Sequence, residues 1–385
     1  MLKKLSREAY EKFSNCCSER SFMQTVEMAD LLRCRGFDVT YLGWESDGEL
    51  TVAGLLYSMP ERGGLRMEIN SGPVSSKQED LKLFYSALRD YAKENGALEL
   101  LIKPYDTYQT FDSNGQATSK EKKELITDLV DLGYQFDGLQ TGYPDGEPHW
   151  HYIKDLSNLD NNQLLKSFNK NSQRNIKKAK QLGITIRALE RHELETFSWL
   201  VQKTGERQGF SSKDIHYYQQ FFDSFQTKTA FVVAEIQFTQ ALNKLQTALT
   251  TANSKQEKAS IEKAITLLEP FAQDYKDEVV PLAGALMIYL PSEVTYLFGG
   301  SDNQFKKLSA PFLLQYTTML QAIDANIPLY NFLGIMGVFD GTDGVLRFKQ
   351  NFNGYIVRKM GTFRYYPRPV KYKIIQGIKK LLGRY

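Results

Sequence analysis

Cysteine is scarce in this sequence, and no long apolar run occurs in it. The 385 residues include three Cys, at positions 16, 17 and 34, of which the first two are adjacent. Adjacent cysteines are poorly placed to pair with each other, so we expect no disulfide framework and a reducing compartment. The longest uncharged apolar stretch, 279–290, has 12 residues and contains a proline. A transmembrane helix needs about 20 such residues, so we expect no membrane span.

Net charge of one sign and the usual cofactor signatures are also absent. Lys and Arg total 48 against 45 Asp and Glu, a formal net charge of +3, so the molecule as a whole is not a basic nucleic-acid binder. The N-terminal residues are charged and lack the apolar core of a secretory signal, and we expect a cytoplasmic protein. No glycine-rich phosphate loop follows a candidate strand, and His149 and His151 have no third ligand beside them. We therefore expect no cofactor and no metal.

Segments typical of strands and helices are mixed along the chain, which indicates an α/β (α+β) fold. The length suits two or three domains, and 42% hydrophobic with 24% charged residues is ordinary for a globular protein. Strands are predicted at 37–43, 51–57, 98–102, 231–235, 283–290, 294–298 and 328–332, the fifth and sixth as a hairpin. Helices are predicted at 81–95, 121–132, from 160 or 161 through 175 or beyond, at 193–207 and at 310–325.

One segment differs in composition from its surroundings. From 236 to 275 the residues Gln, Lys, Glu, Ala and Leu dominate, and apolar residues recur every three or four positions on both sides of a polar break at 251–258. That spacing predicts two heptad-like helices that form an antiparallel hairpin. We therefore divide the chain into a first domain, 1–155, a second domain, 156–235 with 279–385, and an inserted helical arm, 236–278.

Six short segments, taken in order, carry a resemblance to a known family. They are 22–25 (Phe-Met-Gln-Thr), the basic run 167–180 with Gly183 and Ile184, 204–210, 297–301, 330–337 and 344–349. The ordered set, with a helical arm between the third and the fourth, resembles the Fem/Mur family of aminoacyltransferases, and its MurM and MurN branch in particular. The resemblance implies two GNAT-like acyltransferase subdomains with a coiled-coil arm inserted in the second.

The resemblance also implies a reaction. An amino acid, Ala or Ser, passes from aminoacyl-tRNA to the Lys side-chain amine of a peptidoglycan stem peptide, carried by lipid II or by the nucleotide-linked muramyl pentapeptide. No cofactor is required, because the ester of the charged tRNA is already activated. Two alternatives stay open, namely an acyl-CoA-dependent N-acyltransferase and a tRNA-binding adaptor without enzymatic activity. The arm is then either a surface insertion without function or a contact for tRNA or for the substrate body.

Lys349 is the candidate catalytic residue. The reaction passes through a tetrahedral oxyanion, and a fixed ammonium stabilises that charge more in the transition state than in the ground state. The resemblance implies this role for the Lys of the Phe348-Lys349 pair, with Phe348 packed on the terminal nucleotide. The alternative from the residue pattern is an edge strand, with Arg347 and Lys349 directed outward and Phe348 in the core.

Other cations and aromatic residues are candidates for binding the acceptor. Its phosphates need positive charge, and an Arg holds phosphate oxygens bidentately, which makes Arg207 the first choice and Arg33 the second. Tyr217 and Tyr218 are candidates to line the same cleft. The alternatives are a solvated charge at a helix end for Arg207 and half-buried packing for the two tyrosines.

Two basic segments are candidates for contact with tRNA and with membrane. Lys170, Arg174 and either Lys177 or Lys178 lie three or four residues apart in a run without acids, which suits a helix face that contacts a phosphate backbone. The tail, 369–385, is basic and amphipathic, so it is a candidate for peripheral contact with an anionic membrane. The alternatives are a solvated helix face for the first segment and a helix docked on the protein body for the second.

Overall fold

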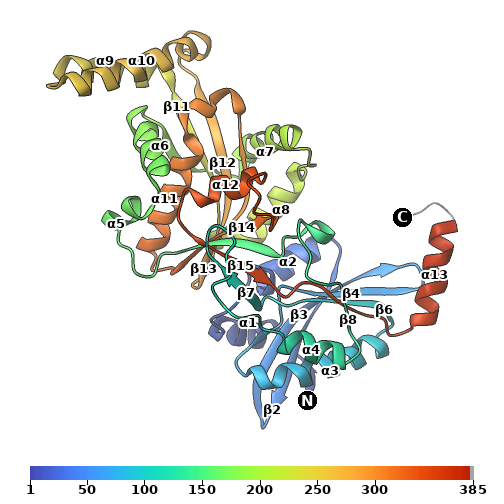
Figure 1. The fold of residues 1–385 in the computed structure, drawn as a ribbon. Helices are drawn as coiled ribbons and strands as arrows, with labels where there is room; N and C mark the ends of the chain where they lie inside the picture. Colours follow the sequence, from blue (N-terminus) through green and yellow to red (C-terminus); the bar gives the residue numbers. More distant parts are fainter. Residues whose placement is uncertain (382–385) are drawn as a thin grey trace. The chain divides into compact units, whose positions relative to one another are not determined.

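The structure is a computed structural model that describes residues 1–381, and the chain divides into two compact units (Figure 1). The first contains 1–152, 334–346 and, among the described residues, 355–381; the second contains 153–333 and 347–354. This division differs from the domains expected from the sequence, which assigned all of 279–385 to the second domain. Most of the C-terminal segment joins the first unit, because β16 (Phe363–Tyr365) pairs with β6 (Ala97–Lys103).

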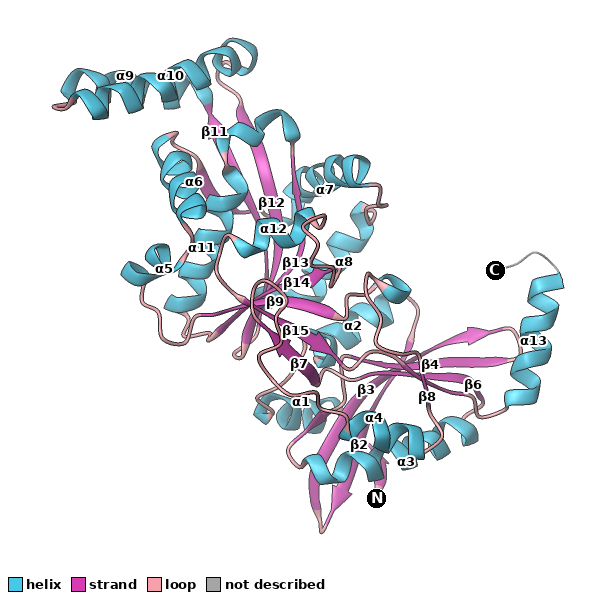
Figure 2. Ribbon diagram, viewed as in Figure 1, coloured by secondary structure: helices cyan, strands magenta, loops and turns pink. Residues whose placement is uncertain are grey.

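The first unit is a twisted sheet with helices on its faces (Figure 2). Its strand order is β1-β2-β3-β4-β6-β16-β8, with β5 paired to β3. The strands of this sheet not yet given are β1 Leu2–Lys4, β2 Asp38–Ser46, β3 Glu49–Glu61, β4 Gly64–Asn70, β5 Val74–Ser75 and β8 Gln135–Phe136. Three further strands lie outside this order: β7 Thr107–Phe111, β9 Trp150–Asp155 and β15 Tyr355–Lys359. The helices are α1 Arg7–Cys16, α2 Val26–Cys34, α3 Leu81–Glu94, α4 Glu124–Asp131 and α13 Pro369–Leu381. β7 and β15 form an antiparallel pair.

Alternate strand residues of the first unit face different helix layers. Leu42 and Ile69 are buried in one cluster with Phe84 of α3. Tyr41, the neighbour of Leu42, faces the opposite side and stacks on Tyr10 of α1, with 4.5 Å between ring centroids. Because successive strand side chains point to opposite faces, the sheet has a core on each side.

The second unit is built around strands in the order β10-β11-β12-β13-β14. The strands are β10 Thr185–Ala188, β11 Thr229–Gln237, β12 Val279–Tyr289, β13 Glu293–Ser301 and β14 Leu329–Ile335. The helices are α5 Asn161–Ser167, α6 Lys170–Gln181, α7 Leu194–Gln208, α8 Ile215–Phe225, α11 Ala310–Asp324 and α12 Gly344–Gln350. α7 and α8 cover one face of the sheet, and α6 and α11 cover the other (Figure 1). The mixed class predicted from the sequence is confirmed.

Both units use the same order of elements. Two helices follow the first strand, three further antiparallel strands follow the helices, and one helix leads to a fifth strand that runs parallel to the fourth. In the first unit these elements are β1, α1, α2, β2, β3, β4, α3 and β6. In the second they are β10, α7, α8, β11, β12, β13, α11 and β14. The chain therefore contains one topology twice.

The units differ most between their second and third strands. β2 and β3 are joined by a tight turn at Asp47 and Gly48, which both have positive φ, as a type I′ turn requires. β11 and β12 are instead separated by two helices, α9 Phe238–Thr251 and α10 Lys255–Tyr275, which pack as a hairpin that extends away from the sheet (Figure 1). At the base of this arm, Phe238 lies 5.9 Å from Phe305 between ring centroids. The predicted helical hairpin is confirmed.

One predicted helix has the wrong extent. The segment expected to be continuous from 160 or 161 through 175 or beyond divides into α5 and α6. Phe168 leaves the helical path to pack against Phe352, with ring centroids 5.2 Å apart, and Asn169 accepts a hydrogen bond from Ser172 N as the N-cap of α6. Of the two candidate caps, Asp160 and Asn161, it is Asp160 that caps α5. The helix breaks because the burial of an aromatic ring outweighs local helix propensity.

The structure also bears on the predictions about membrane spans and disulfides. Within residues 1–381, no helix combines the length and the apolar character that crossing a bilayer requires. Cys16, Cys17 and Cys34 are unpaired. Residues 382–385 of the predicted amphipathic tail lie outside the described residues, and 369–381 form α13.

Candidate active site

The parallel strands β13 and β14 stop pairing early. Glu293–Thr295 pair with Leu329–Asn331, although β13 continues to Ser301 and β14 to Ile335. Leu333 has a φ of +55°, which is unusual for any residue except glycine. Its N–H donates to Asn331 Oδ1 at 2.8 Å, and Asn331 Nδ2 donates to Glu293 Oε2 at 3.1 Å. This buried network holds β14 in an irregular conformation.

The irregular conformation directs two consecutive carbonyls toward one side chain. In a regular strand, successive carbonyls point to opposite sides. Here Lys349 Nζ donates to Phe332 O at 2.7 Å and to Leu333 O at 3.1 Å. Lys349 is only 4% exposed. The two carbonyl dipoles orient the ammonium in a buried setting, where electrostatic interactions are stronger than in water.

The segment that carries Lys349 is a helix. Val345 N and Leu346 N donate to Asp343 Oδ1 at 2.8 and 3.1 Å, so Asp343 acts as the N-cap that starts α12. Arg347 is exposed, whereas Lys349 is buried. The edge-strand alternative for 344–349 is therefore wrong, because a capped helical turn places these two residues on different sides.

Phe348 lies on the same helix with part of its ring accessible. It is half-buried, and its ring centroid lies 5.2 Å from that of Phe312 and 5.5 Å from that of Phe352. The ring thus has a packed side and an open side. This arrangement leaves a surface on which a flat group such as a nucleobase can stack.

Arg207 lies in the last turn of α7, beside the end of β13. Its Nη1 is 3.5 Å from Ser301 O, and Thr204 Oγ1 accepts a hydrogen bond from Ser301 N at 2.9 Å. α7 approaches β13 this closely because residue 300 is glycine, and a Cβ there would lie 2.3 Å from the backbone of Leu200. The Arg207 guanidinium is exposed. Exposure is compatible with both interpretations of Arg207, as a ligand for phosphate and as a solvated charge at a helix end.

The two tyrosines of α8 have different surroundings. Tyr218 is buried, with its ring centroid 5.0 Å from Phe197 and 6.0 Å from Phe298, and burial raises the pKa of its hydroxyl. Tyr217 is half-buried, and the Lys213 ammonium lies 5.7 Å from its ring centroid. Packing therefore describes Tyr218, whereas Tyr217 retains accessible surface.

Arg33 belongs to the first unit. Its Nη1 lies 3.2 Å from Asp30 Oδ1, and its guanidinium lies 5.4 Å from the Tyr41 ring centroid. Asp30 is shared with Arg7, whose Nη1 lies 2.6 Å from the same oxygen. One carboxylate is thus shared by two guanidinium groups.

The 22–25 segment has a clear structural role. Gln24 is fully buried: Leu55 N donates to its Oε1 at 2.8 Å, and its Nε2 donates to Asn70 O at 2.7 Å. Thr25 caps α2 by accepting a hydrogen bond from Met28 N. The side chain of Gln24 therefore ties β3 to the end of β4, and this motif supports the fold of the first unit.

A groove of about 800 Å³ with a basic lining runs between α6 and the arm helix α10. It is lined by Lys170, Gln173, Arg174, Lys177, Lys178, Gln181 and Leu182 from the α6 side, and by Ser260, Lys263, Ala264 and Leu267 from α10. None of these described lining residues is acidic. Gln181 Nε2 donates to Ser260 Oγ at 3.1 Å and joins the two sides. All four cations predicted to contact tRNA thus line one groove.

The cations of the groove are not equivalent. Lys170, Arg174 and Lys177 are exposed, whereas Lys178 is half-buried and donates to Lys307 O at 2.6 Å. Burial, and then the nearby charge of Lys307, lowers the pKa of Lys178. Lys263 was missed by sequence reasoning, because only the folding of the arm beside α6 brings it to the groove. Its position on the polar face of a heptad-like helix was the one available signal.

Comparison with known proteins identifies relatives over the full length of the chain. A model of the FemAB family matches residues 5–380. The aminoacyltransferase FemA of Staphylococcus epidermidis is 26% identical over 411 aligned positions, which cover 98% of this chain and 98% of that protein. FemA of Staphylococcus aureus is 25% identical over 415 positions, which cover 99% of this chain and 98% of that protein.

Solved structures share the fold. The crystal structure of FemX has a TM-score of 0.77 at 22% identity and covers 97% of this chain and 99% of its own. A tandem GNAT protein from the clavulanic acid biosynthesis pathway has a TM-score of 0.53 at 9% identity and covers 96% of this chain and 99% of its own. The prediction of a tandem GNAT-like fold is confirmed, and it accounts for the topology that occurs twice.

Proposed function

This chain belongs to the FemAB family of aminoacyltransferases, and from that premise we propose that it transfers an amino acid from aminoacyl-tRNA to a peptidoglycan precursor. The acceptor is the Lys side-chain amine of the stem peptide, carried by lipid II in preference to the nucleotide-linked muramyl pentapeptide. The donor amino acid is Ala or Ser, as the resemblance to the MurM and MurN branch implies. Charged tRNA is cytoplasmic, so the reaction takes place in the cytoplasm, at the inner face of the plasma membrane for a lipid-linked acceptor.

The observation that carries the proposal is the buried ammonium of Lys349. It donates to two carbonyls of an irregular strand, which fix its position before substrate arrives. An ammonium fixed in this way needs no reorganisation when negative charge develops beside it, and this is the main condition for electrostatic catalysis. We assign Lys349 the role of stabilising the tetrahedral oxyanion.

The transfer step balances without a cofactor. The amine nitrogen attacks the ester carbonyl carbon of the charged tRNA, and a C–N bond forms while the carbonyl oxygen becomes an oxyanion. Collapse of this intermediate breaks the C–O bond to the ribose. The amine loses one proton and the ribose oxygen gains one, so the products are an amide and uncharged tRNA. Lys349 keeps its own proton throughout, because its role is electrostatic.

The groove between α6 and α10 suits the donor tRNA. Its cations come from two helices and can contact several successive phosphates. Contacts to phosphates bind tRNA without regard to its base sequence. Lys170, Arg174, Lys177 and Lys178 contribute from α6, and Lys263 contributes from the arm. This assignment gives the arm a function as one wall of the nucleic-acid site.

The remaining candidates serve the acceptor in this proposal. In the second unit, Arg207 contacts acceptor phosphates, and Tyr217 and Tyr218 contribute to the surface beside it, Tyr218 by packing beneath it. In the first unit, Arg33 offers the same phosphate-binding chemistry. Phe348 stacks on the terminal nucleotide of the tRNA. These roles rest on residue chemistry and on the exposure of Arg207 and of part of Phe348.

The acyl-CoA alternative requires a phosphate-binding turn before a helix. In the second unit that place is the segment 302–309, between β13 and α11, and it contains no glycine. Close approach of backbone N–H groups to a pyrophosphate depends on glycine in such turns. This composition favours an ester of tRNA over a thioester of CoA as the donor.

A transfer assay tests the proposal. Purified protein is incubated with Ala-tRNA, Ser-tRNA or acetyl-CoA, and with lipid II or nucleotide-linked muramyl pentapeptide. We expect a mass gain of one Ala or Ser residue on the stem-peptide Lys, with charged tRNA only. An acceptor in which that Lys is acetylated is the control and should give no product. Product from acetyl-CoA, or binding of tRNA without product from any charged tRNA, would overturn the proposal.

A further inference from the structure

The C-terminal helix α13 exposes an apolar stripe. Val370, Ile374, Ile378 and Leu381 are 72%, 58%, 45% and 88% exposed. They recur at intervals of four, four and three residues, so they lie on one side of the helix, within an arc of about 80° at roughly 100° per residue. Exposed apolar residues are ordinary when they are scattered, but a continuous stripe indicates a binding surface.

The opposite side of α13 is fixed to the first unit. A Cβ on Gly63, in the turn between β3 and β4, would lie 2.5 Å from Ile375 Cδ1, so this side chain packs directly on the turn. Lys379 Nζ lies 3.6 Å from Glu61 Oε2, and the rings of Tyr372 and Tyr366 are 4.2 Å apart. These contacts determine which way the helix faces, and they turn the stripe away from the unit. The docked-helix alternative therefore describes one side of α13 only.

The charge around the stripe has one sign. α13 contains no acidic residue. Lys371 borders one edge of the stripe, and Lys373 and Lys380 border the other, at about 100°, 300° and 280° from Val370 around the helix. All three are exposed. Lys side chains at the edges of an apolar face can reach lipid phosphates while the apolar residues enter the acyl region.

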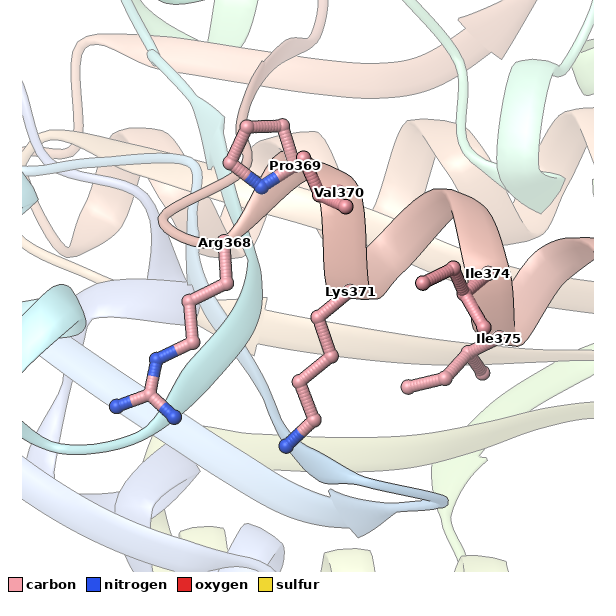
Figure 3. Close-up of a pocket in the computed structure, with 6 residues that line it drawn as sticks. All are labelled: Arg368, Pro369, Val370, Lys371, Ile374 and Ile375. Atoms are coloured by element: carbon pink, nitrogen blue, oxygen red, sulfur yellow. The ribbon is translucent and has the colours of Figure 1, made fainter.

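A shallow, open depression lies along the first turns of the helix. It is lined by Arg368, Pro369, Val370, Lys371, Ile374 and Ile375 (Figure 3). In Figure 3 the side chains of Arg368 and Lys371 extend in the same direction, beside the apolar ones. An apolar surface with two cations next to it matches the chemistry of an anionic lipid, which has a phosphate above an acyl chain.

We propose that α13 is an interfacial helix that binds an anionic lipid bilayer. Its stripe enters the boundary between headgroups and acyl chains, and Lys371, Lys373 and Lys380 contact lipid phosphates. The helix has 13 residues, too few to span a bilayer, so it lies in the plane of the surface. The positive charge favours a membrane over a second copy of the chain, because two such helices would repel each other. The inference concerns lipid binding alone and stands independently of the transferase activity.

Vesicle flotation of the full chain tests this proposal. We expect binding to vesicles of phosphatidylcholine with about 30% phosphatidylglycerol, and little binding to pure phosphatidylcholine. The double variant Ile374→Ser/Ile378→Ser should lower the partition coefficient at least tenfold, because it removes half of the stripe. Lys373→Gln/Lys380→Gln should lower it about fivefold per charge at low salt, and the effect should fade in about 0.5 M salt.

A matched control separates the stripe from general loss of apolar surface. Leu83 on α3 and Val130 on α4 are 49% and 47% exposed, and Leu83→Ser/Val130→Ser should leave vesicle binding unchanged. Equal binding by the Ile374→Ser/Ile378→Ser variant, or no binding of the wild-type chain to anionic vesicles, would overturn the proposal. So would a dimer in light scattering that this variant abolishes, since the stripe would then serve self-association. Transfer to a soluble acceptor should be the same for all these variants, which keeps this test distinct from that of the proposed function.

Discussion

In the first unit, β4 and β6 pair from Leu65–Asn70 with Ala97–Lys103, whereas in the second the corresponding strands β13 and β14 pair only over Glu293–Thr295 and Leu329–Asn331. The same position in one topology is thus closed by hydrogen bonds in one unit and open in the other. Where the strands part, the second unit has an irregular residue whose carbonyl, with that of its neighbour, holds a buried Lys. Both units thus share the framework of a duplicated fold, whereas Lys349 and the two carbonyls that hold it lie in the second unit.

Two buried lysines, one in each unit, have different partners. In the first, Lys103 Nζ lies 3.0 Å from Glu68 and 3.2 Å from Glu147; burial lowers its pKa, but the two carboxylates outweigh this and raise it. In the second, Lys154 Nζ donates to Asn353 O at 3.3 Å, and burial lowers its pKa to about 8. Carboxylates stabilise a buried charge, whereas carbonyls mainly orient it.

The largest stability effect should follow from breaking the ion pairs of the first unit. Lys103→Met removes the nearer of two cations from the buried Glu68 and leaves Arg66, whose Nη2 lies 3.6 Å from it. Loss of one partner of a buried pair typically costs about 3–5 kcal/mol. Urea unfolding followed by circular dichroism measures this. Lys82 pairs with Asp128 at the surface, so Lys82→Met is the control and should cost less than about 1 kcal/mol. Equal losses of unfolding free energy for Lys103→Met and Lys82→Met would contradict the prediction that the buried ion pairs stabilise the fold more than the surface pair does.

In the second unit, a substitution is expected to raise the stability of the protein, by a smaller amount. Lys154→Met should stabilise the protein by about 1–3 kcal/mol at pH 7, because it removes a buried charge whose burial outweighs the effect of Asp155 and of its carbonyl and aromatic partners. The folded pKa of Lys154 is below its ordinary value of 10.5, so the unfolded chain binds more protons between these two values. Wild-type stability therefore rises as pH increases from about 8, and the advantage of the variant should shrink toward pH 10. Thermal melts at pH 7 and pH 10 measure this, and a destabilised Lys154→Met protein at pH 7 would contradict it.

The smallest effects should come from single charges of the basic groove. Arg174→Gln, Lys177→Gln and Lys263→Gln should each weaken tRNA binding a few-fold at about 0.1 M salt. Each should also reduce the slope of log affinity against log salt by about one. Filter binding over a salt series measures both quantities. Lys166 lies on α5 outside the groove, and Lys166→Gln should change neither. If Lys263→Gln is also silent, the arm is a surface insertion with no role in tRNA binding.

Much of the framework was predictable because its signals are local. Gly96 and Gly133 have positive φ just beyond α3 and α4, as expected for residues that follow a helix C-terminus. Apolar residues spaced by three and four, such as Leu242, Leu245 and Leu249, identified the arm. Apolar spacing and the glycines that follow helices are both local in sequence, and they are enough to predict elements of this kind.

The candidate site was predictable only in part, because its geometry depends on distant residues. Nothing in a leucine indicates the positive φ of Leu333, which Asn331 and Glu293 support through hydrogen bonds. The alternation in 344–349 favoured a strand, and Asp343 was not recognised as the N-cap that makes this segment helical. Residue identity pointed to Lys349, whereas its burial and its carbonyl partners required the fold.

The central claim is that the fixed ammonium of Lys349 stabilises the oxyanion, and single-turnover transfer tests it most directly. Enzyme in excess over Ala-tRNA or Ser-tRNA is mixed with lipid II, and the rate of product formation is compared for wild type, Lys349→Met and Lys154→Met, after thermal melts verify folding. The account predicts a rate lower by about 100–1,000-fold for Lys349→Met, with tRNA affinity nearly unchanged and with Lys154→Met close to wild type. A folded Lys349→Met protein that transfers within about threefold of the wild-type rate would contradict it.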